Sequence, residues 1–180
     1  MLNNQPQIAT IILRKIVPAD ALVITTLRNT PQVLKYLDAT VITNAKQANT
    51  YIAQLRNEKT NYARVIVYNG ILVGICYLKD FNTTHRFAFI TFYLNNNYWG
   101  KGIMQHALTH FISTAFVDIP ALHRIEAQVH EHNEGSCALL ARIGFTKEGE
   151  ARNNFFVNEQ PFNSQVYSLL RTDVVNAAIK

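Results

Sequence analysis

The first third of the chain predicts one strand followed by helices. Residues 8–17 are rich in β-branched and aliphatic side chains and stop at Pro18, a pattern that predicts a strand. Residues 19–28 and 31–37 then favour two short helices, and an amphipathic helix is predicted over about 44–58.

The clearest local signal is a hairpin in the middle of the chain. Two apolar segments, 63–68 and 71–78, flank Asn69-Gly70. This dipeptide favours a two-residue hairpin turn because both central positions need a positive φ. A third segment, 86–94, alternates aromatic and aliphatic residues, so three consecutive antiparallel strands are predicted.

A glycine-rich turn separates the third strand from a long predicted helix. Apolar side chains then recur at intervals of three or four residues, which predicts one continuous apolar stripe on that helix. The stripe comprises Ile103, Met104, Ala107, Leu108, Phe111, Ile112 and Ala115.

The last third alternates strands with one helix. Strands are predicted at 124–129, 145–152 and 165–170, and a helix begins at Asn133 or Ser136 and ends at Gly144. The whole order is mixed α/β (α+β), with hairpins early and a β-α-β-α-β order late. We see no repeat or linker, so residues 1–180 are predicted to be a single domain.

Composition narrows the class of protein and its location. No apolar run approaches the roughly 20 residues that a membrane-spanning helix needs, and the N-terminus lacks the pattern of a secretory signal. The two cysteines, Cys76 and Cys137, are isolated, which fits a reducing compartment. We therefore expect a cytoplasmic protein without membrane partners.

The net charge of +5 favours an anionic ligand but does not identify one. Because the basic residues are scattered and form no block, they give no direct signal for nucleic-acid binding. The oligomeric state is open between monomer and homodimer.

A strand, a glycine turn and a helix start together form a general phosphate-binding device. The first amides of a helix lack internal partners and point toward an anion, and the helix dipole adds partial positive charge. Gly100 and Gly102 let the backbone approach the anion, and Lys101 adds positive potential. A P-loop and a dinucleotide fingerprint are both excluded by spacing, since Gln105 occupies the third glycine position of the latter.

The motifs of the second half occur in an order that is far more specific than any one of them. They are Tyr98-Trp99-Gly100-Lys101-Gly102, Arg124-Ile125-Glu126-Ala127, Asn133-x-x-Ser136, Ile143-Gly144-Phe145 and Glu148-Gly149. In these motifs the chain resembles the GNAT superfamily, in particular the branch that acetylates the N-termini of ribosomal proteins. The resemblance implies a GNAT fold: a mixed, mostly antiparallel sheet of about seven strands with helices on both faces.

The resemblance also implies a site for acetyl-CoA. The strand before the glycine turn splays from its neighbour, and Phe92, Tyr93 and Leu94 would pair with the pantetheine arm. Asn133 would hydrogen-bond the pantetheine, and Ser136 would lie near the thioester sulfur as the acid for the leaving thiolate. The pyrophosphate would lie on the amides of Asn97, Tyr98, Trp99, Gly100, Lys101, Gly102 and Ile103.

Several positions depart from the family pattern and leave the catalytic base unassigned. Phe89 occupies the position where many relatives have a carboxylate, Thr91 replaces a family glycine, and Leu140 stands where other branches have a tyrosine acid. Ser136 has helix capping as its alternative role. The remaining candidates for a base or a substrate contact are His85, Glu126, His130, Glu131 and His132.

No metal is predicted. His106 and His110 have a metal-compatible i, i+4 spacing, but they lie on a polar helix face without a third ligand nearby. The resemblance thus predicts direct transfer of acetyl from acetyl-CoA to a primary amine, with a protein N-terminus as the leading acceptor. A small amine such as a polyamine or an aminoglycoside is the enzymatic alternative, and a non-catalytic acyl-CoA-binding module is the other.

Overall fold

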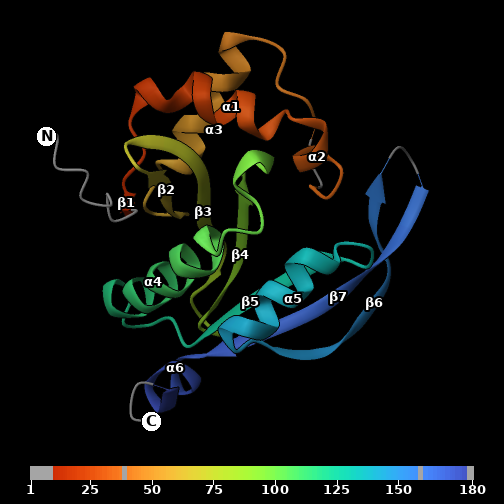
Figure 1. The fold of residues 1–180 in the computed structure, drawn as a ribbon. Helices are drawn as coiled ribbons and strands as arrows, with labels where there is room; N and C mark the ends of the chain where they lie inside the picture. Colours follow the sequence, from red (N-terminus) through yellow and green to blue (C-terminus); the bar gives the residue numbers. More distant parts are fainter. Residues whose placement is uncertain (1–9, 38–39, 158–159, 178–180) are drawn as a thin grey trace, which may run out of the picture.

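A seven-stranded sheet forms the centre of the protein in the computed structural model, which describes residues 10–37, 40–157 and 160–177 (Figure 1). The strands lie in the order β1-β2-β3-β4-β5-β7-β6. Every neighbouring pair is antiparallel except β4 and β5, which are parallel. The predicted mixed, mostly antiparallel sheet is therefore confirmed.

The elements follow one another along the chain as follows. The strands are β1 (Ile11–Arg14), β2 (Tyr62–Tyr68), β3 (Ile71–Asn82), β4 (Phe87–Leu94), β5 (Arg124–His130), β6 (Thr146–Val157) and β7 (Gln160–Leu170). The α-helices are α1 (Ala21–Arg28), α2 (Pro31–Leu34), α3 (Ala45–Leu55), α4 (Ile103–Asp118), α5 (Glu134–Ile143) and α6 (Arg171–Ala177). Two 3₁₀ turns, η1 (Pro18–Asp20) and η2 (Asn96–Tyr98), precede α1 and the glycine turn.

Helices cover both faces of the sheet, and each face has its own core (Figure 1). On one face, Ile24 of α1 and Ile52 of α3 pack with Val65, Ile75 and Tyr93 of the sheet. On the other face, the apolar stripe of α4 packs with the sheet and α5, and every member of the predicted stripe is buried. Each such large side chain contributes about 1.5–3 kcal/mol by leaving water, so these two cores fix the sheet between the helices.

The predicted hairpin between β2 and β3 is confirmed. Tyr68 is the register partner of Ile71, so Asn69 and Gly70 alone form the turn. Their φ values are +49° and +81°, the left-handed conformation that this dipeptide tolerates.

The N-terminal elements are shorter than the sequence pattern predicts. Of the predicted strand over 8–17, residues 8 and 9 lie outside the described residues, and the pairing ends at Arg14. The reason is local, because the Asp20 carboxylate accepts the Arg14 guanidinium at 2.7 Å and the Val17 amide at 2.9 Å and turns the chain. The second predicted helix likewise ends at Leu34.

The C-terminal hairpin is longer than predicted, and α6 was not predicted. Strands β6 and β7 extend well beyond the predicted 145–152 and 165–170, through asparagine-rich segments that resemble loops. Asn153, at φ +50°, sits in an irregularity of the pairing, and its amide donates to the Asn163 side chain at 3.0 Å. The asparagines thus hold the bulge of a long hairpin instead of ending its strands.

Arg171 ties the C-terminal part of the chain to the end of α4. Its guanidinium donates to the carbonyl oxygens of Phe116 at 2.6 Å, Ile119 at 2.9 Å, Pro120 at 3.1 Å and Leu122 at 2.6 and 2.9 Å. Phe116 lies in the last turn of α4, where carbonyls have no partner within the helix, and the other three carbonyls lie just beyond it, so this cation bonds the helix end and also complements the helix dipole.

We predict that Arg171→Ala destabilises the fold by about 3 kcal/mol, because four carbonyls, most of them in part-buried bonds, lose a charged donor. For a chain of this size, that loss lowers Tm by roughly 6–12 °C. Thermal unfolding followed by circular dichroism measures the change, with the exposed Arg152→Ala variant as the control. A Tm of Arg171→Ala that equals the control value would show that the five bonds are not needed.

Candidate active site

Strands β4 and β5 diverge in the middle of the sheet. They share only three register pairs, from Phe87↔Arg124 to Phe89↔Glu126. Beyond that point β4 stays paired with β3 as far as Leu94, and β5 stays paired with β7 as far as His130. The predicted splay is therefore confirmed, and among the described residues the facing edges of the two strands have no strand between them.

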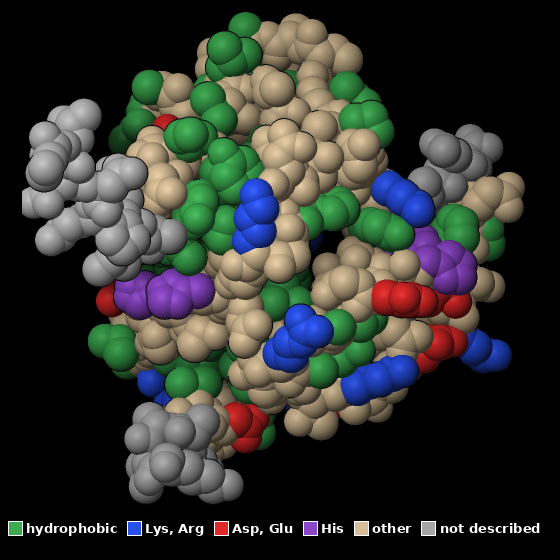
Figure 2. Space-filling model, in the orientation of Figure 1, with side chains coloured by type: hydrophobic (Ala, Val, Ile, Leu, Met, Phe, Trp, Pro, Cys, Tyr) green, Lys and Arg blue, Asp and Glu red, His purple; other side chains and the backbone are tan. Residues whose placement is uncertain are grey.

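A cavity of about 640 Å³ opens at this divergence. Figure 2 shows the molecule hollowed near the middle of this face, with Lys and Arg side chains on both sides of the hollow. The end of β4, the glycine turn, the start of α4, the start of α5 and the α2 segment contribute to the lining. The structure thus brings the predicted cofactor residues together, since all of them except Asn97 and Lys101 line the cavity.

The amides that could hold a phosphate begin at Gly100 and not at Asn97. The amides of Asn97, Tyr98 and Trp99 donate to Asn95 or Asn96 within η2 at 2.9–3.1 Å. The first helical bond of α4 is His106 N–H to Gly102 O at 3.1 Å. Among the described residues, no acceptor takes the amides of 100–105, so they form the free set expected at a helix start.

Both glycines of the turn need to be glycine. Gly100 and Gly102 have φ values of +72° and +74°, and a Cβ at either position would meet nothing within 4 Å. Open space at a free-amide turn is where an anion would approach, so a side chain there would occupy it. Lys101 is not part of the cavity lining. Its Nζ donates to Asn97 O at 2.9 Å and lies 5.3 Å from the centre of the Tyr98 ring.

Trp99 links the glycine turn to the end of β4. Its Nε1 donates to Leu94 O at 2.8 Å, while 49% of the residue stays exposed at the cavity. It is the only tryptophan of the chain, so its fluorescence reports on this site alone.

A close approach that the sequence analysis missed fixes the inner side of β4. A Cβ on Gly74 of β3 would lie 2.7 Å from Tyr93 O and 2.8 Å from the Leu94 side chain. Only glycine therefore allows β3 to pack this tightly against the segment of β4 that lines the cavity.

Asn133 and Ser136 have separate roles at the start of α5. Asn133 is the N-cap residue, and its side-chain oxygen accepts the Ser136 amide at 3.2 Å. Ser136 is therefore the capped residue and not the cap, so capping does not account for its hydroxyl. Both side chains line the cavity, and the Asn133 side-chain amide nitrogen remains available as a donor.

Sequence comparison assigns the fold to a family. The profile of the acetyltransferase (GNAT) domain matches residues 10–146. The chain belongs to the GNAT acetyltransferase family. It is accordingly an acyltransferase that transfers acetyl from acetyl-CoA to nitrogen.

Individual relatives cover nearly the whole chain. The uncharacterized N-acetyltransferase p20 of Bacillus licheniformis is 28% identical over 166 residues, 89% of this chain and 93% of that protein. The structure of the Vibrio cholerae spermidine N-acetyltransferase with CoA and spermine is similar at a TM-score of 0.84 and 21% identity, covering 92% of this chain and 98% of that chain. The structure of RimL, a ribosomal L7/L12 α-N-protein acetyltransferase, in complex with CoA is similar at a TM-score of 0.81 and 18% identity. The similarity covers 89% of this chain and 94% of that chain. At these identities the two structures show a shared GNAT fold.

The far wall of the cavity comes from α2 and its following turn. Gln32, Val33, Tyr36 and Leu37 belong to the lining, as do His132 and Ser136. Sequence reasoning missed this wall, because contact between α2 and the β5–α5 turn is long-range and leaves no local pattern.

An aromatic cluster borders the cavity on this side. The buried His130 ring lies 4.6 Å from the Phe162 ring, 5.4 Å from Phe155, 5.6 Å from Tyr36 and 5.5 Å from His132, measured between centroids. Burial, with the neighbouring His132 as a second cause, lowers the pKa of His130 below its ordinary value. His130 is thus a neutral imidazole at pH 7.

The other candidate residues lie outside the lining. His85 is exposed in the turn between β3 and β4. Glu131 accepts the Asn163 amide at 2.9 Å. His106 and His110 are exposed on α4, and the described part of the chain holds no group of three or more His, Cys, Asp or Glu residues that could bind a metal.

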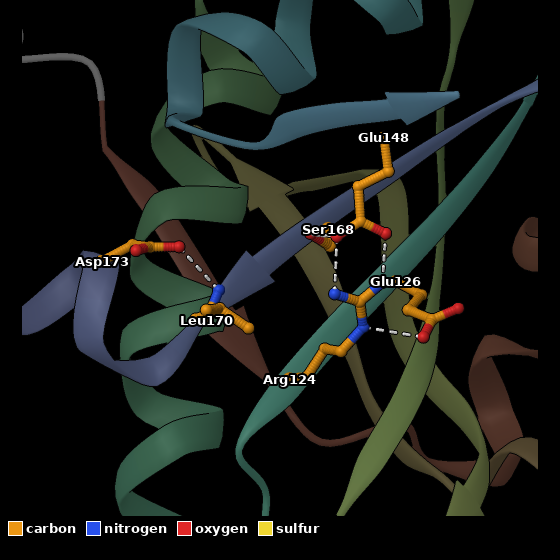
Figure 3. Close-up of polar contacts among 6 residues, drawn as sticks. All are labelled: Arg124, Glu126, Glu148, Ser168, Leu170 and Asp173. Atoms are coloured by element: carbon orange, nitrogen blue, oxygen red, sulfur yellow. Dashed lines mark hydrogen bonds and ion pairs between the residues drawn. The ribbon is translucent and has the colours of Figure 1, made fainter. Parts of the chain in front are cut away.

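Glu126 is held in an ion network just below the divergence (Figure 3). Arg124 Nε donates to Glu126 at 2.8 Å, and the other two nitrogens of Arg124 donate to Glu148 at 2.5 and 2.8 Å. Ser168 donates to the same Glu148 at 2.7 Å. The network connects β5, β6 and β7 where β5 last pairs with β4, so it fixes β5 at the closed end of the cavity.

The Arg124 bonds lower the pKa of Glu148 to about 2. A depressed carboxyl pKa stabilises the fold above the unfolded pKa of about 4.3, and that stabilisation is lost as pH falls toward 2. The Glu148 side chain is 40% exposed, so we predict that Glu148→Gln costs only about 0.2–1 kcal/mol at pH 7.

Urea unfolding at a series of pH values tests this prediction. The difference between the native protein and Glu148→Gln is expected to shrink steadily below about pH 4.3. Glu150→Gln is the matched control, because the Glu150 carboxylate accepts only from the Asn163 and Gln165 side-chain amides. A Glu148→Gln difference that stays constant down to pH 3 would contradict the assigned ion pair.

Proposed function

We propose that acetyl-CoA lies in the divergence between β4 and β5 and donates its acetyl group to a protein N-terminus. The free amides of 100–105 beside the cavity carry this proposal, because they can neutralise a pyrophosphate at a helix start. The pantetheine would pair with the edge of Phe92–Leu94 and hydrogen-bond the Asn133 side chain. The thioester would then lie near Ser136.

The reaction that this arrangement supports is a direct attack. The neutral amine adds to the thioester carbon, a tetrahedral intermediate carries charge on the former carbonyl oxygen, and the C–S bond breaks. The Ser136 hydroxyl would give its proton to the departing CoA thiolate and regain one from water. Much of the rate would come from holding the amine against the thioester.

The lining favours a peptide over a polyamine. Glu134 is the only carboxylate among the described residues that line the cavity, and Arg142 adds a positive charge there. A polycation would need several acidic partners, whereas an N-terminus presents one amine with a pKa of about 7.7–8, of which roughly a tenth is neutral at pH 7. RimL, with its ribosomal-protein acceptor, is in line with this choice, and the spermidine enzyme of Vibrio cholerae represents the small-amine alternative.

The number of domains and the cellular compartment of the protein are also proposed. We propose one domain over residues 1–180, because β7 pairs with both β5 and β6 and so adds the C-terminal hairpin to the same sheet. Cys76 and Cys137 are both free, as in proteins of the reducing cytoplasm. No helix of the described residues could cross a membrane. Monomer and homodimer remain the two states to compare by sedimentation.

Cofactor binding is tested by ligand-induced stabilisation and by Trp99 fluorescence. At about 100 times Kd, CoA should add about 2.7 kcal/mol of stability, which is roughly 5–10 °C in Tm. Gly102→Ala should weaken CoA binding at least tenfold, because its left-handed conformation costs roughly 1–2 kcal/mol with a Cβ, which also enters the anion site.

The control for Gly102→Ala is Gly149→Ala, since Gly149 lies on β6 and a Cβ there meets nothing within 4 Å. Equal CoA affinity of the two variants would contradict the proposal that the glycine turn binds the pyrophosphate.

Thiol release with a panel of acceptors separates the candidate functions. A higher kcat/KM for an N-terminal peptide supports the proposal, and a higher kcat/KM for spermidine favours the small-amine alternative. Binding of acetyl-CoA without turnover would favour the non-catalytic module.

Ser136→Ala tests the acid. We predict a fall in kcat of about 10²-fold, within the range for losing a general acid, with little change in Tm because Asn133 caps the helix. Asn133→Ala is the contrasting variant, expected to lose about 1 kcal/mol of stability as well as affinity for CoA. An unchanged kcat in Ser136→Ala would remove its hydroxyl from the mechanism.

A further inference from the structure

Direct transfer is faster at neutral pH with a group that takes a proton from the acceptor ammonium, because only about a tenth of an α-amine is neutral at pH 7. Phe89 cannot do so, and Glu126 is outside the lining and bonded to Arg124 at 2.8 Å. Within the described lining, His132 is the only imidazole and Glu134 the only carboxylate. The choice of base is therefore narrowed to two side chains that lie on the same turn.

Proton affinity separates these two groups. An imidazole, with an ordinary pKa near 6.5, lies little more than one unit below an α-amine, whereas a glutamate near 4.3 lies more than three units below it. General-base catalysis is most efficient when the base is poised near the working pH. An imidazole is accordingly the better match for an N-terminal amine at neutral pH.

The backbone around His132 is fixed by its neighbour. The His132 amide donates to His130 Nδ1 at 3.2 Å, and the Asn133 amide donates to His130 O at 2.8 Å. Because His130 Nδ1 accepts, the proton of that neutral ring is on Nε2, and His130 has no free lone pair for a substrate proton. His130 is thus a positioning residue, and the exposed His132 ring keeps access to both the cavity and water.

We propose that His132 is the general base of this enzyme, an inference that rests on the proposed function. The imidazole nitrogen accepts one proton from the acceptor ammonium, which leaves a neutral amine to form the C–N bond. The C–S bond then breaks and Ser136 gives its proton to the thiolate. The second proton of the attacking nitrogen passes through water to the Ser136 oxygen, and the imidazolium returns its proton to water. His132 and Ser136 both line the cavity, and they lie four residues apart around the start of α5, so one segment of the chain supplies both proton steps.

Other ionisable groups lie near His130 and His132 and can affect the pH dependence of catalysis. His132 and Lys35, which follows α2, act to lower the pKa of His130, Glu131 acts to raise it, and Glu134 shares the lining with His132. A nearby cation disfavours a protonated imidazole and a nearby carboxylate favours it. The pH profile of His132 variants therefore has to be compared with Glu134→Gln in parallel.

The experiment is a pH profile of kcat/KM for an N-terminal peptide acceptor, with thiol release as the readout. For the native enzyme, the acidic limb of the kcat/KM profile should lie below the pKa of the amine itself, about 7.7–8. In His132→Gln, kcat/KM at pH 7 should drop by about 10²–10⁴-fold, and the limb should move to about 7.7–8, the pKa of the amine itself. Added imidazole should restore part of the loss in this variant only.

Two measurements separate a base from a structural residue. The CoA affinity of His132→Gln, titrated by Trp99 fluorescence, should stay within about twofold of the native value, as should that of the control His110→Gln on the exposed face of α4. The proposal would be overturned if the acidic limb of the kcat/KM profile did not move in His132→Gln, or if it moved by the same amount in Glu134→Gln instead. If the native enzyme binds acetyl-CoA but releases no thiol with any amine, the proposed function fails and this inference with it.

Discussion

The parting of two parallel strands is the constraint on which the site depends. Backbone N–H and C=O groups must find partners, and strands β4 and β5 satisfy one another only as far as Phe89 and Glu126. From there each strand is held by its outer neighbour, β4 by β3 and β5 by β7. The edge between them is a polar slot inside an otherwise continuous sheet, and an extended ligand with amide groups is the chemical species that such a slot fits.

The two ends of the slot are fixed by different interactions. At the closed end, Arg124 of β5 bonds to Glu126 of the same strand and to Glu148 of β6 (Figure 3). These bonds hold β5 to β6 at the point where β5 last pairs with β4. At the open end, the Trp99 indole bonds to Leu94 O, which places the free amides of the glycine turn just beyond the slot. In the proposed function, phosphate binding and thioester placement would thereby be linked through one strand and one side chain.

Local patterns predicted those parts of the protein that are determined locally. The β2–β3 turn follows from Asn69-Gly70, and the buried face of α4 follows from apolar spacing. The long C-terminal hairpin does not, because its bulge depends on a bond between Asn153 and Asn163 across the two strands. In the sequence alone, asparagines at these positions indicate loops.

The site was predictable to the same extent and for the same reason. The motifs predicted a set of cofactor residues, most of which line one cavity. They could not show that the amides of Asn97 and its neighbours already donate hydrogen bonds within η2. They also could not show which residue caps α5, whereas the Asn133 bond to the Ser136 amide identifies Asn133 as the cap; the role of Ser136 as the acid stays a prediction. The α2 wall depends on tertiary packing and leaves no trace in a local pattern.

The choice of base and the choice of acceptor constrain one another. An imidazole near pKa 6.5 takes a proton from an α-amine of about 7.7–8 at small cost, but from a lysine of about 10.4 only against a gap of almost four units. At about 1.4 kcal/mol per unit, that gap adds roughly 5 kcal/mol to the proton transfer. With His132 as the proposed base and a single carboxylate in the described lining, the site would select for an amine of low basicity and low charge. Recognition of the N-terminus would then lie in its proton affinity as much as in its shape.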